Sequence, residues 1–469
     1  MGILGGFMVP HPPIILPEIG RGEEEKIRKT TESYKRVAEE IARLRPDTIV
    51  ISSPHSVMYG DYFHISPGKR AVGDLGAFRA GQVCFDEEYD EAFTKELVRL
   101  ADAEEFPAGF LGEKDPKLDH GTMIPLYFVR KAYRDFKLVR IGLSGLPLPM
   151  HYRLGEMIRE TAERLGRKVV FIASGDLSHK LKEDGPYGLS DEGPVYDDRI
   201  MQVMGSADFG ELFAFDESFC EKAAECGHRS FVMMAGAFDG MAVRPEALSH
   251  EGTFGVGYGI CTFLPEGPDE SRHFLDLYEA KKRERIGMQR AGEDAYVRIA
   301  RRALETYLLT GKVLRPEKEF PELFDAPEGR ELFHSAAGAF VSLHKDGHLR
   351  GCIGTILPTK SCVAEELVRN AISAATADPR FDAVREDEID SLEYSVDVLG
   401  RPEKISGPEE LDVRRYGVIV SCGMRRGLLL PDLDGVDTVE EQITIARKKG
   451  GIREGEPVEL ERFEVIRHH

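Results

Sequence analysis

Hydrophobic and polar positions follow two different patterns along the first half of the chain. Over 23–44 the apolar residues recur every three to four positions, as in an amphipathic helix, and 151–165 also reads as helix. Short apolar runs, typical of buried strands, stand at 3–9, 48–53, 137–143, 168–174 and 258–265. This alternation predicts an α/β domain with a largely parallel or mixed central sheet and flanking helices.

The pattern changes after residue 265. The stretch PEGPDESRHF is polar and contains two prolines, and a long charged helical stretch follows it. We therefore expect a first domain over 1–265, a linker over 266–284, and a smaller α+β domain over 285–469. In the second domain, helices are predicted at 295–309, 361–375 and 437–449, and strands at 338–344, 392–399 and 416–422.

Composition narrows the class of protein. The chain is 42% hydrophobic and 31% charged, as in globular proteins, and no run approaches the ~20 apolar residues of a membrane span. Its start lacks the features of a secretion signal, and its seven scattered cysteines form no CxxC pair. The net charge of −20 opposes binding to nucleic acid or anionic lipid. We expect a soluble, cytoplasmic protein with reduced thiols that binds neither partner.

Five histidines stand where strand-like runs give way to loops. Ligands of open α/β sheets bind at the carboxyl ends of the strands, so side chains there converge from distant parts of the sequence. We therefore expect His11, His55 and the Asp176–His179 pair to be neighbours. The five histidines are His11, His55, His120, His179 and His228.

These residue types are those of a metal site. A single histidine is more often structural than a ligand, but several at equivalent strand ends favour a metal. Two histidines and one carboxylate form the open site of non-haem Fe(II) oxygenases, and zinc accepts the same ligands. From the residues alone, iron and zinc both stay open.

The motifs VPHPP, SSPH, LDHGT and SGDLSH occur in this order through the first domain. Together they resemble the class III extradiol ring-cleavage dioxygenases of the LigB type and their Memo-type relatives. The resemblance implies that His11 and His55 bind Fe(II) and that Glu225, in AAECGHRS, is the matching carboxylate ligand. It also implies that His179 is the acid/base histidine and that His120 contacts substrate or oxygen.

At the third ligand position the sequence fits both the LigB-type and the Memo-type pattern. Memo-type proteins have a cysteine before the glycine at this place, and the chain offers both Glu225 and Cys226. We favour Glu225, because a carboxylate suits Fe(II) with open positions better than a thiolate does. Ligation by Cys226 would instead make the domain more Memo-like. Asp176, three residues before His179, is expected to orient the imidazole of that histidine.

The second domain contains the dense motif HLRGCIGT at 348–355. Taken alone it is typical of a β-turn with a buried cysteine, although Arg350 beside Cys352 would favour a thiolate. Followed by ATADPRF, LEYSVDVLGRPEKI and GLLLPDLDG, it resembles an AMMECR-type domain. That resemblance implies no established reaction, so Arg350, Cys352, Asp378 and Arg380 are candidate site residues only.

A chain with both domains resembles the A-type component of AmmeMemoRadiSam systems, which implies a radical-SAM protein as partner. The chain has no CxxxCxxC cluster of its own. Our leading hypothesis is an Fe(II)-dependent oxidoreductase that opens a catechol-like aromatic substrate with dioxygen. The alternatives are a Memo-like metal- or peptide-binding component without turnover, and a zinc hydrolase. The sequence leaves the substrate and any oligomer open.

Overall fold

The computed structural model describes residues 2–114, 117–345, 347–433 and 435–469. The chain divides into two compact units, Met1–Glu279 and Ala280–His469. Helix α9 (Phe274–Gly292) begins in the first unit and ends in the second. The residue limits drawn from the sequence, with a linker over 266–284, stay a prediction.

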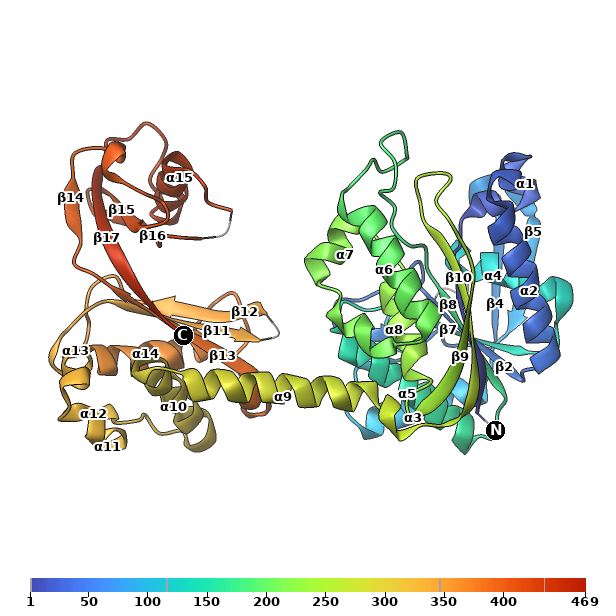
Figure 1. The fold of residues 1–469 in the computed structure, drawn as a ribbon, viewed down its shortest axis with the longest axis horizontal. Helices are drawn as coiled ribbons and strands as arrows, with labels where there is room; N and C mark the ends of the chain where they lie inside the picture. The colour runs from blue at the N-terminus through green and yellow to red at the C-terminus, as the bar shows by residue number, and fades with distance from the viewer. Residues whose placement is uncertain (1, 115–116, 346, 434) are drawn as a thin grey trace. The chain divides into compact units, whose positions relative to one another are not determined.

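A mixed six-stranded sheet forms the centre of the N-terminal unit (Figure 1). Four neighbouring strands run parallel, and the last two are antiparallel to their neighbours. This confirms the predicted mixed sheet. In spatial order the strands are β7 (Lys137–Gly142), β2 (Thr48–Ser53), β8 (Val169–Ser174), β1 (Ile3–Val9), β10 (Tyr258–Pro268) and β9 (Met241–Glu251).

Helices cover both faces of this sheet, and a separate hydrophobic core fills the space on each side. The parallel strands are almost wholly buried, because both faces are covered, and so they read as continuous apolar runs. On one face lie α2 (Arg28–Leu44) and α4 (His120–Ala132). On the other lie α3 (Glu91–Ala103), α5 (Leu148–Arg164), α6 (Glu192–Ser206) and α8 (His228–Gly236).

Short elements fill the loops of this unit. The short helices are α1 (Pro17–Gly20) and α7 (Glu217–Ala223). The short strands form two pairs, β3 (Phe63–His64) with β6 (Ala108–Gly109) and β4 (Arg70–Leu75) with β5 (Ala80–Glu88). The long strands β1, β8 and β2 position the candidate site. They are parallel neighbours, so their carboxyl ends meet at one edge of the sheet.

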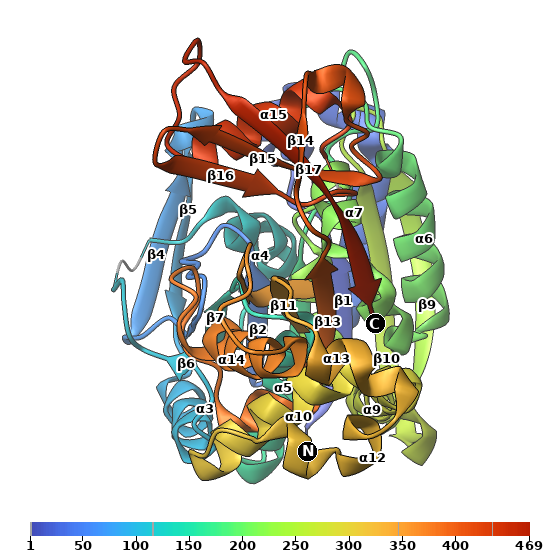
Figure 2. The same ribbon diagram turned by 90° about the vertical axis from the view of Figure 1, so that its left-hand side faces the viewer.

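The C-terminal unit is α+β, as predicted, and is built on a seven-stranded antiparallel sheet (Figure 2). The strands are β11 (Ala339–Lys345), β12 (His348–Gly354), β13 (Leu392–Leu399), β14 (Glu403–Ile405), β15 (Tyr416–Cys422), β16 (Arg425–Leu429) and β17 (Glu459–His468). The helices are α10 (Ala295–Thr310), α11 (Pro316–Glu319), α12 (Pro321–Phe324), α13 (Arg330–His334), α14 (Val363–Thr376) and α15 (Val439–Lys449). Helices α10 and α14 share a core with β11 and β13, and α15 packs against β15 and β16.

The prediction of a β-turn at HLRGCIGT was wrong. These residues form strand β12, which lies at the edge of the sheet and pairs with β11. The glycine serves close packing, because a Cβ on Gly351 would lie 2.2 Å from the carbonyl oxygen of Ala374 in α14. Across the described residues of both units, no helix combines the length and hydropathy needed to span a membrane.

Candidate metal centre

Three side chains converge at the carboxyl edge of the N-terminal sheet. The Nε2 atoms of His11 and His55 lie 3.0 Å apart, and Cys226 Sγ lies 3.7 Å from His11 Nε2. The three potential ligand atoms all lie within 4.8 Å of one another. His11 follows β1 and His55 follows β2, while Cys226 comes from the loop before α8.

These separations fit ligation of one metal ion. Metal–nitrogen bonds of about 2.0–2.1 Å and metal–sulfur bonds of about 2.3 Å place two tetrahedral nitrogens about 3.3 Å apart and a nitrogen and a sulfur about 3.6 Å apart. The distances between His11 Nε2 and its two partners agree with these values to within a few tenths of an ångström. Three protein ligands also leave a coordination position open for a substrate.

The hydrogen bonds of His11 fix its tautomer. Ser174 Oγ donates to the carbonyl oxygen of Gly121 at 2.6 Å, so the same hydroxyl accepts from His11 Nδ1 at 3.0 Å. His11 therefore carries its proton on Nδ1 and directs the lone pair of Nε2 toward His55 and Cys226. An outer hydrogen-bond partner of this kind is typical of metal-ligating histidines.

A second network holds the loop of His55. Asp119 caps the start of α4 and accepts a hydrogen bond of 2.6 Å from Ser53 Oγ, whose oxygen in turn accepts from the backbone N–H of His55. Gly121 makes this contact possible, since a Cβ there would lie 2.4 Å from Ser53 Oγ. The motifs SSPH and LDHGT thus form one structural unit.

The structure places Cys226, and not the favoured Glu225, in the cluster. The Glu225 carboxylate accepts a hydrogen bond of 2.6 Å from the backbone N–H of His228, at the first turn of α8. There it satisfies a free donor and complements the helix dipole. Burial raises the pKa of Glu225 to about 7 and that of Cys226 well above its usual value. The geometry therefore favours the alternative ligand, Cys226, and a thiol of this kind loses its proton when it binds metal.

Two glycines let the loop of Cys226 approach β8. A Cβ on Gly175 would lie 2.1 Å from the Cα of Gly227, so the two backbones are in direct contact. The N–H of Asp176 points to Cys226 Sγ at 3.2 Å. Ala224, with a φ of 52°, turns the chain at the end of α7 just before this contact.

Asp176 lies beside His11 instead of His179, which corrects its expected role. One carboxylate oxygen accepts from the His11 backbone N–H at 2.7 Å, and the other lies 3.9 Å from His11 Nε2. Burial raises the pKa of Asp176 to about 7, and the His11 hydrogen bond opposes that rise. The imidazole of His179 is oriented by a backbone group: its Nδ1 bonds the carbonyl oxygen of Ala224 at 2.6 Å.

The remaining predicted histidines divide into two groups. The His120 ring lies 4.0 Å from that of His55 and 5.4 Å from that of His11, measured between centroids. His228 is outside the cluster: its ring nitrogens contact the Leu212 carbonyl oxygen and the Tyr196 hydroxyl. His120 thus joins the site, whereas His228 is structural.

The histidines of the cluster are held in the neutral state. Burial, followed by the neighbouring His55, His120 and His179, keeps the pKa of His11 well below its usual value. Burial and His55 lower the pKa of His120 to about 4. Burial also lowers the pKa values of His55 and His179. Neutral imidazole is the form that binds metal and accepts protons, so the cluster is ready for both at neutral pH.

The candidate residues of the C-terminal unit fall into two charge pairs. The guanidinium of Arg350 donates to both carboxylate oxygens of Glu388, at 3.1 and 3.0 Å. Arg380 pairs with Asp378 at 2.7 Å. That pair binds the outer edge of β12, because Asp378 accepts from the N–H of Cys352 and Arg380 donates to its carbonyl oxygen.

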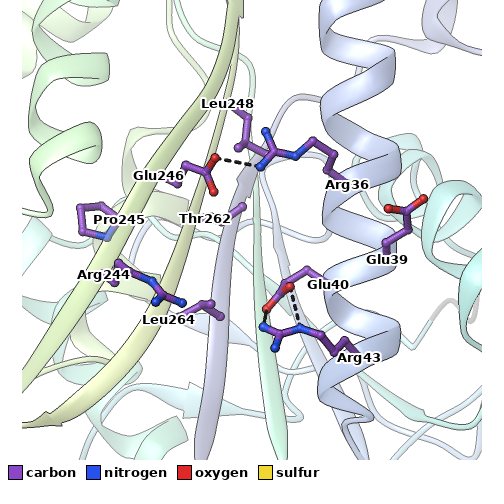
Figure 3. A pocket seen from close by; sticks show the side chains of 10 residues that line it. All are labelled: Arg36, Glu39, Glu40, Arg43, Arg244, Pro245, Glu246, Leu248, Thr262 and Leu264. Atoms are coloured by element: carbon purple, nitrogen blue, oxygen red, sulfur yellow. Dashed lines mark hydrogen bonds and ion pairs between the residues drawn. The ribbon is translucent and has the colours of Figure 1, made fainter.

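One surface groove of the described residues is separate from the histidine cluster. A groove of about 520 Å³ lies between α2 and the β9–β10 hairpin (Figure 3), and its described lining contains none of the site residues predicted from the sequence. Its charges pair with one another, as in the ion pair of 2.8 Å between Arg36 and Glu246. Arg43 pairs with Glu40 in the same groove. We assign it no catalytic role.

Sequence reasoning missed the outer partners Ser53, Ser174 and Asp119. Ser53 and Ser174 are the last residues of their strands, and Asp119 directly precedes His120. A polar residue that ends an otherwise apolar strand was the available signal, since such a residue lies at the ligand-binding edge of the sheet.

Comparison with known proteins identifies two families along the chain. The model of the catalytic LigB subunit of aromatic ring-opening dioxygenase matches residues 5–261, and the AMMECR1 model matches 297–468. A protein of Clostridium acetobutylicum is 41% identical over 481 residues, covering 100% of this chain and 99% of that protein. A Thermotoga maritima protein is 54% identical over 179 residues, which are 38% of this chain and 98% of that protein.

Two solved structures are also similar to parts of the chain. An uncharacterized protein of Pyrococcus horikoshii has 35% sequence identity and a TM-score of 0.33, covering 37% of this chain and 88% of that one. An uncharacterized protein of Escherichia coli K12 has 16% identity and a TM-score of 0.38, covering 56% of this chain and 99% of that one.

Proposed function

The chain belongs to the family of the catalytic LigB subunit of aromatic ring-opening dioxygenases and carries a C-terminal AMMECR1 domain, and from that premise we propose an iron-dependent oxidoreductase. Its N-terminal unit binds one metal ion through His11, His55 and Cys226. Its substrate is a small catechol-like aromatic that chelates the ion through two adjacent oxygens and is opened with dioxygen.

One observation carries this proposal. Two neutral imidazoles and a buried thiol direct their donor atoms at one point, with 3.0 Å between the nitrogens of His11 and His55. His11 is buried, and among the described residues its Nε2 has only His55 and Cys226 as hydrogen-bond partners; a buried polar atom without a strong partner is costly in a low-dielectric interior. A bound cation removes that cost.

The protein residues supply proton transfer and placement. When bound, an Fe(II) ion would supply coordination positions for substrate oxygens and dioxygen. His179 carries its proton on Nδ1, where it bonds the Ala224 carbonyl, so its Nε2 accepts a proton from a phenolic hydroxyl. His120, whose pKa is about 4, is likewise neutral and able to accept a proton. The Ser174 hydroxyl holds His11 in its ligating tautomer.

The cysteine favours zinc as a second candidate metal. Thiolate with imidazole is a common zinc ligand set, and three protein ligands with one open position describe catalytic zinc sites. In that case the unit is a hydrolase in which His179 or His120 accepts a proton from water. The cysteine also makes the unit more Memo-like, and a binding role without turnover is the third possibility.

Metal content and oxygen uptake decide among these functions. The full chain is purified without oxygen, its metals are measured, and oxygen consumption is followed with a panel of catechols. We expect one iron per chain, oxygen uptake and a yellow ring-fission product. His55→Ala should lose the iron, whereas His250→Gln should keep it, because His250 pairs with Asp197 outside the cluster.

Each other outcome contradicts the leading function in its own way. Iron bound in full without turnover of any catechol would favour a binding component. Zinc at full occupancy in protein isolated from cells would favour the hydrolase. Iron retained by His55→Ala would refute the proposed ligand set.

The partners form part of the same proposal. We infer that the AMMECR1 domain modifies or delivers the aromatic substrate and that a radical-SAM protein acts with this chain. Arg350 and Arg380 are each paired with a carboxylate. We therefore do not assign substrate modification or delivery to these two residues.

A further inference from the structure

His120 and His179, the two histidines of the site that are not proposed ligands, each contact one aromatic ring. Phe78 meets His120 edge-on, with 5.4 Å between ring centroids and 66° between the planes. Tyr187 meets His179 in the same way, at 5.2 Å and 88°. The two rings come from different loops, so the cluster has aromatic walls of independent origin.

The two rings differ in how much of their surface is free. Phe78 is partly buried and packs against the hydrophobic core beneath α2 and α4. Tyr187 is 61% exposed although it contacts His179. An exposed aromatic ring beside a buried polar cluster offers apolar surface that water covers until a ligand replaces it.

The loop of Tyr187 is held in place by backbone contacts. Leu181 and Leu189 form an antiparallel bridge that closes the loop, and Gly188 adopts a φ of 76° next to the tyrosine. The Lys182 amino group donates to the carbonyl oxygen of Thr253 at 2.8 Å. Tyr187 is therefore exposed on a fixed loop, which keeps the entropic cost of using its ring low.

The phenol of Tyr187 also influences the buried Tyr258. Burial raises the pKa of Tyr258, and the charges of Asp176 and Tyr187 raise it further. Tyr258 is 3% exposed, and Asp176 bonds the backbone of His11. The direct contact of Tyr187 with the site is its ring contact with His179.

We propose that Tyr187 is the residue that contacts the ring of the substrate and makes the site prefer an aromatic chelator over an aliphatic one. This inference rests on the proposed metal centre. An aromatic contact contributes about 0.5–1.5 kcal/mol beyond burial of area, which corresponds to roughly 2- to 13-fold in affinity. The preference requires the ring of Tyr187 and not its hydroxyl.

Binding of two chelators separates ring recognition from metal binding. The full chain is loaded with Fe(II) without oxygen, and its affinities for 4-nitrocatechol and for acetohydroxamate are measured by calorimetry. Tyr187→Ala should weaken 4-nitrocatechol binding by roughly 2- to 13-fold and change acetohydroxamate binding by less than about 1.5-fold. Tyr187→Phe should bind both as the wild type does. Leu189→Ala, in the same loop and 47% exposed, is the control for a disturbed loop.

The remaining outcomes overturn the inference. Equal weakening of both chelators in Tyr187→Ala, or the same loss in Leu189→Ala, would make Tyr187 a structural residue of the loop. Unchanged 4-nitrocatechol affinity in Tyr187→Ala would exclude contact with the ring. The iron content of the wild type is measured first. If iron is bound and one of these contradicting results is obtained, the role of Tyr187 is refuted while the proposed metal centre stands. If no iron is bound, the proposed function is refuted as well.

Discussion

The histidine cluster of the N-terminal unit and the arginine–carboxylate pairs of the C-terminal unit are both polar groups in protected surroundings, but they are stabilised in opposite ways. Arg350 and Glu388 neutralise each other through two hydrogen bonds, and Lys345 adds a third to the same carboxylate. For His11, burial, followed by the neighbouring His55, His120 and His179, opposes a positive charge. The one acid beside His11, Asp176, has a pKa raised to about 7.

This difference favours the histidine cluster, and not the charge pairs, as a ligand-binding site. A charge pair that satisfies itself needs nothing further and serves the architecture of the fold. Donor atoms directed at one point without an opposite charge are typical of a site that is completed by an ion. The comparison thus supports the proposed metal site in the N-terminal unit and a structural role for Arg350, Glu388, Asp378 and Arg380.

Removing Arg350 should have the largest effect on stability. Arg350→Ala leaves the Glu388 carboxylate, whose side chain is 9% exposed, with Lys345 as its remaining cation. We expect a loss of about 2–3 kcal/mol in the free energy of unfolding of the C-terminal unit, less than for a fully orphaned buried charge. Urea denaturation followed by circular dichroism measures it, with hydrogen exchange of β12 peptides to assign the unit.

Two variants check this result. Lys404→Ala should cost less than about 1 kcal/mol, because both partners of the Lys404–Glu459 ion pair are exposed, at 75% and 73%. Replacing both partners, with Arg350→Met and Glu388→Leu, should restore most of the stability. If Arg350→Ala leaves stability unchanged and instead abolishes an activity of the full chain, the assignment of Arg350 to structure is wrong.

Removing Ser174 should weaken metal binding without removing a ligand. Ser174→Ala deletes the hydroxyl that accepts from His11 Nδ1, so His11 is free to adopt the wrong tautomer. Loss of such an outer partner lowers metal affinity by about 10- to 100-fold. Competition with a chromophoric chelator for Co(II) measures the change.

Ser52→Ala is the matched control, because Ser52 is another buried serine of the same sheet but bonds Ser230 instead of a histidine. Its metal affinity should remain within a few-fold of the wild type. Equal losses in the two variants would show that any cavity at this edge disturbs the site and that the tautomer is irrelevant.

The smallest effect concerns acid stability. Burial alone would raise the pKa of Glu388, but Arg350 and Lys345 lower it to about 2. A folded-state pKa below the unfolded value of about 4.3 stabilises the protein above that pH, and this contribution is lost as pH falls toward 2. Glu388→Gln should therefore be less stable than wild type at pH 6, with a smaller gap at pH 3. A gap that does not change between these pH values would contradict the pairing.

The general fold and the meeting of the histidines were predictable, for a physical reason. Buried parallel strands leave continuous apolar runs in the sequence, and the residue that follows each run must lie at one edge of the sheet. His11 and His55 were located in this way. The edge strand β12 was missed, because Gly351 and Gly354 suggested a turn although Gly351 serves close packing on α14.

The choice between Glu225 and Cys226 could not be made from the sequence. Side chains of consecutive residues point in different directions, so one of the two faces the histidines and the other faces away. The deciding features are the left-handed turn at Ala224 and the contact between Gly175 and Gly227, both of which depend on the folded chain. Preference of a metal for carboxylate or thiolate says nothing about these contacts.

The most direct test of the metal centre is the absorption spectrum of the Co(II)-loaded chain. If Cys226 is a ligand, the wild type shows an intense near-ultraviolet band from thiolate-to-cobalt charge transfer, and Cys226→Ser loses it. Glu225→Gln should keep the band, because a glutamine oxygen can still accept from the N–H of His228. A band that persists in Cys226→Ser, or cobalt binding that is lost in Glu225→Gln while the protein stays folded, would contradict the proposed ligand set.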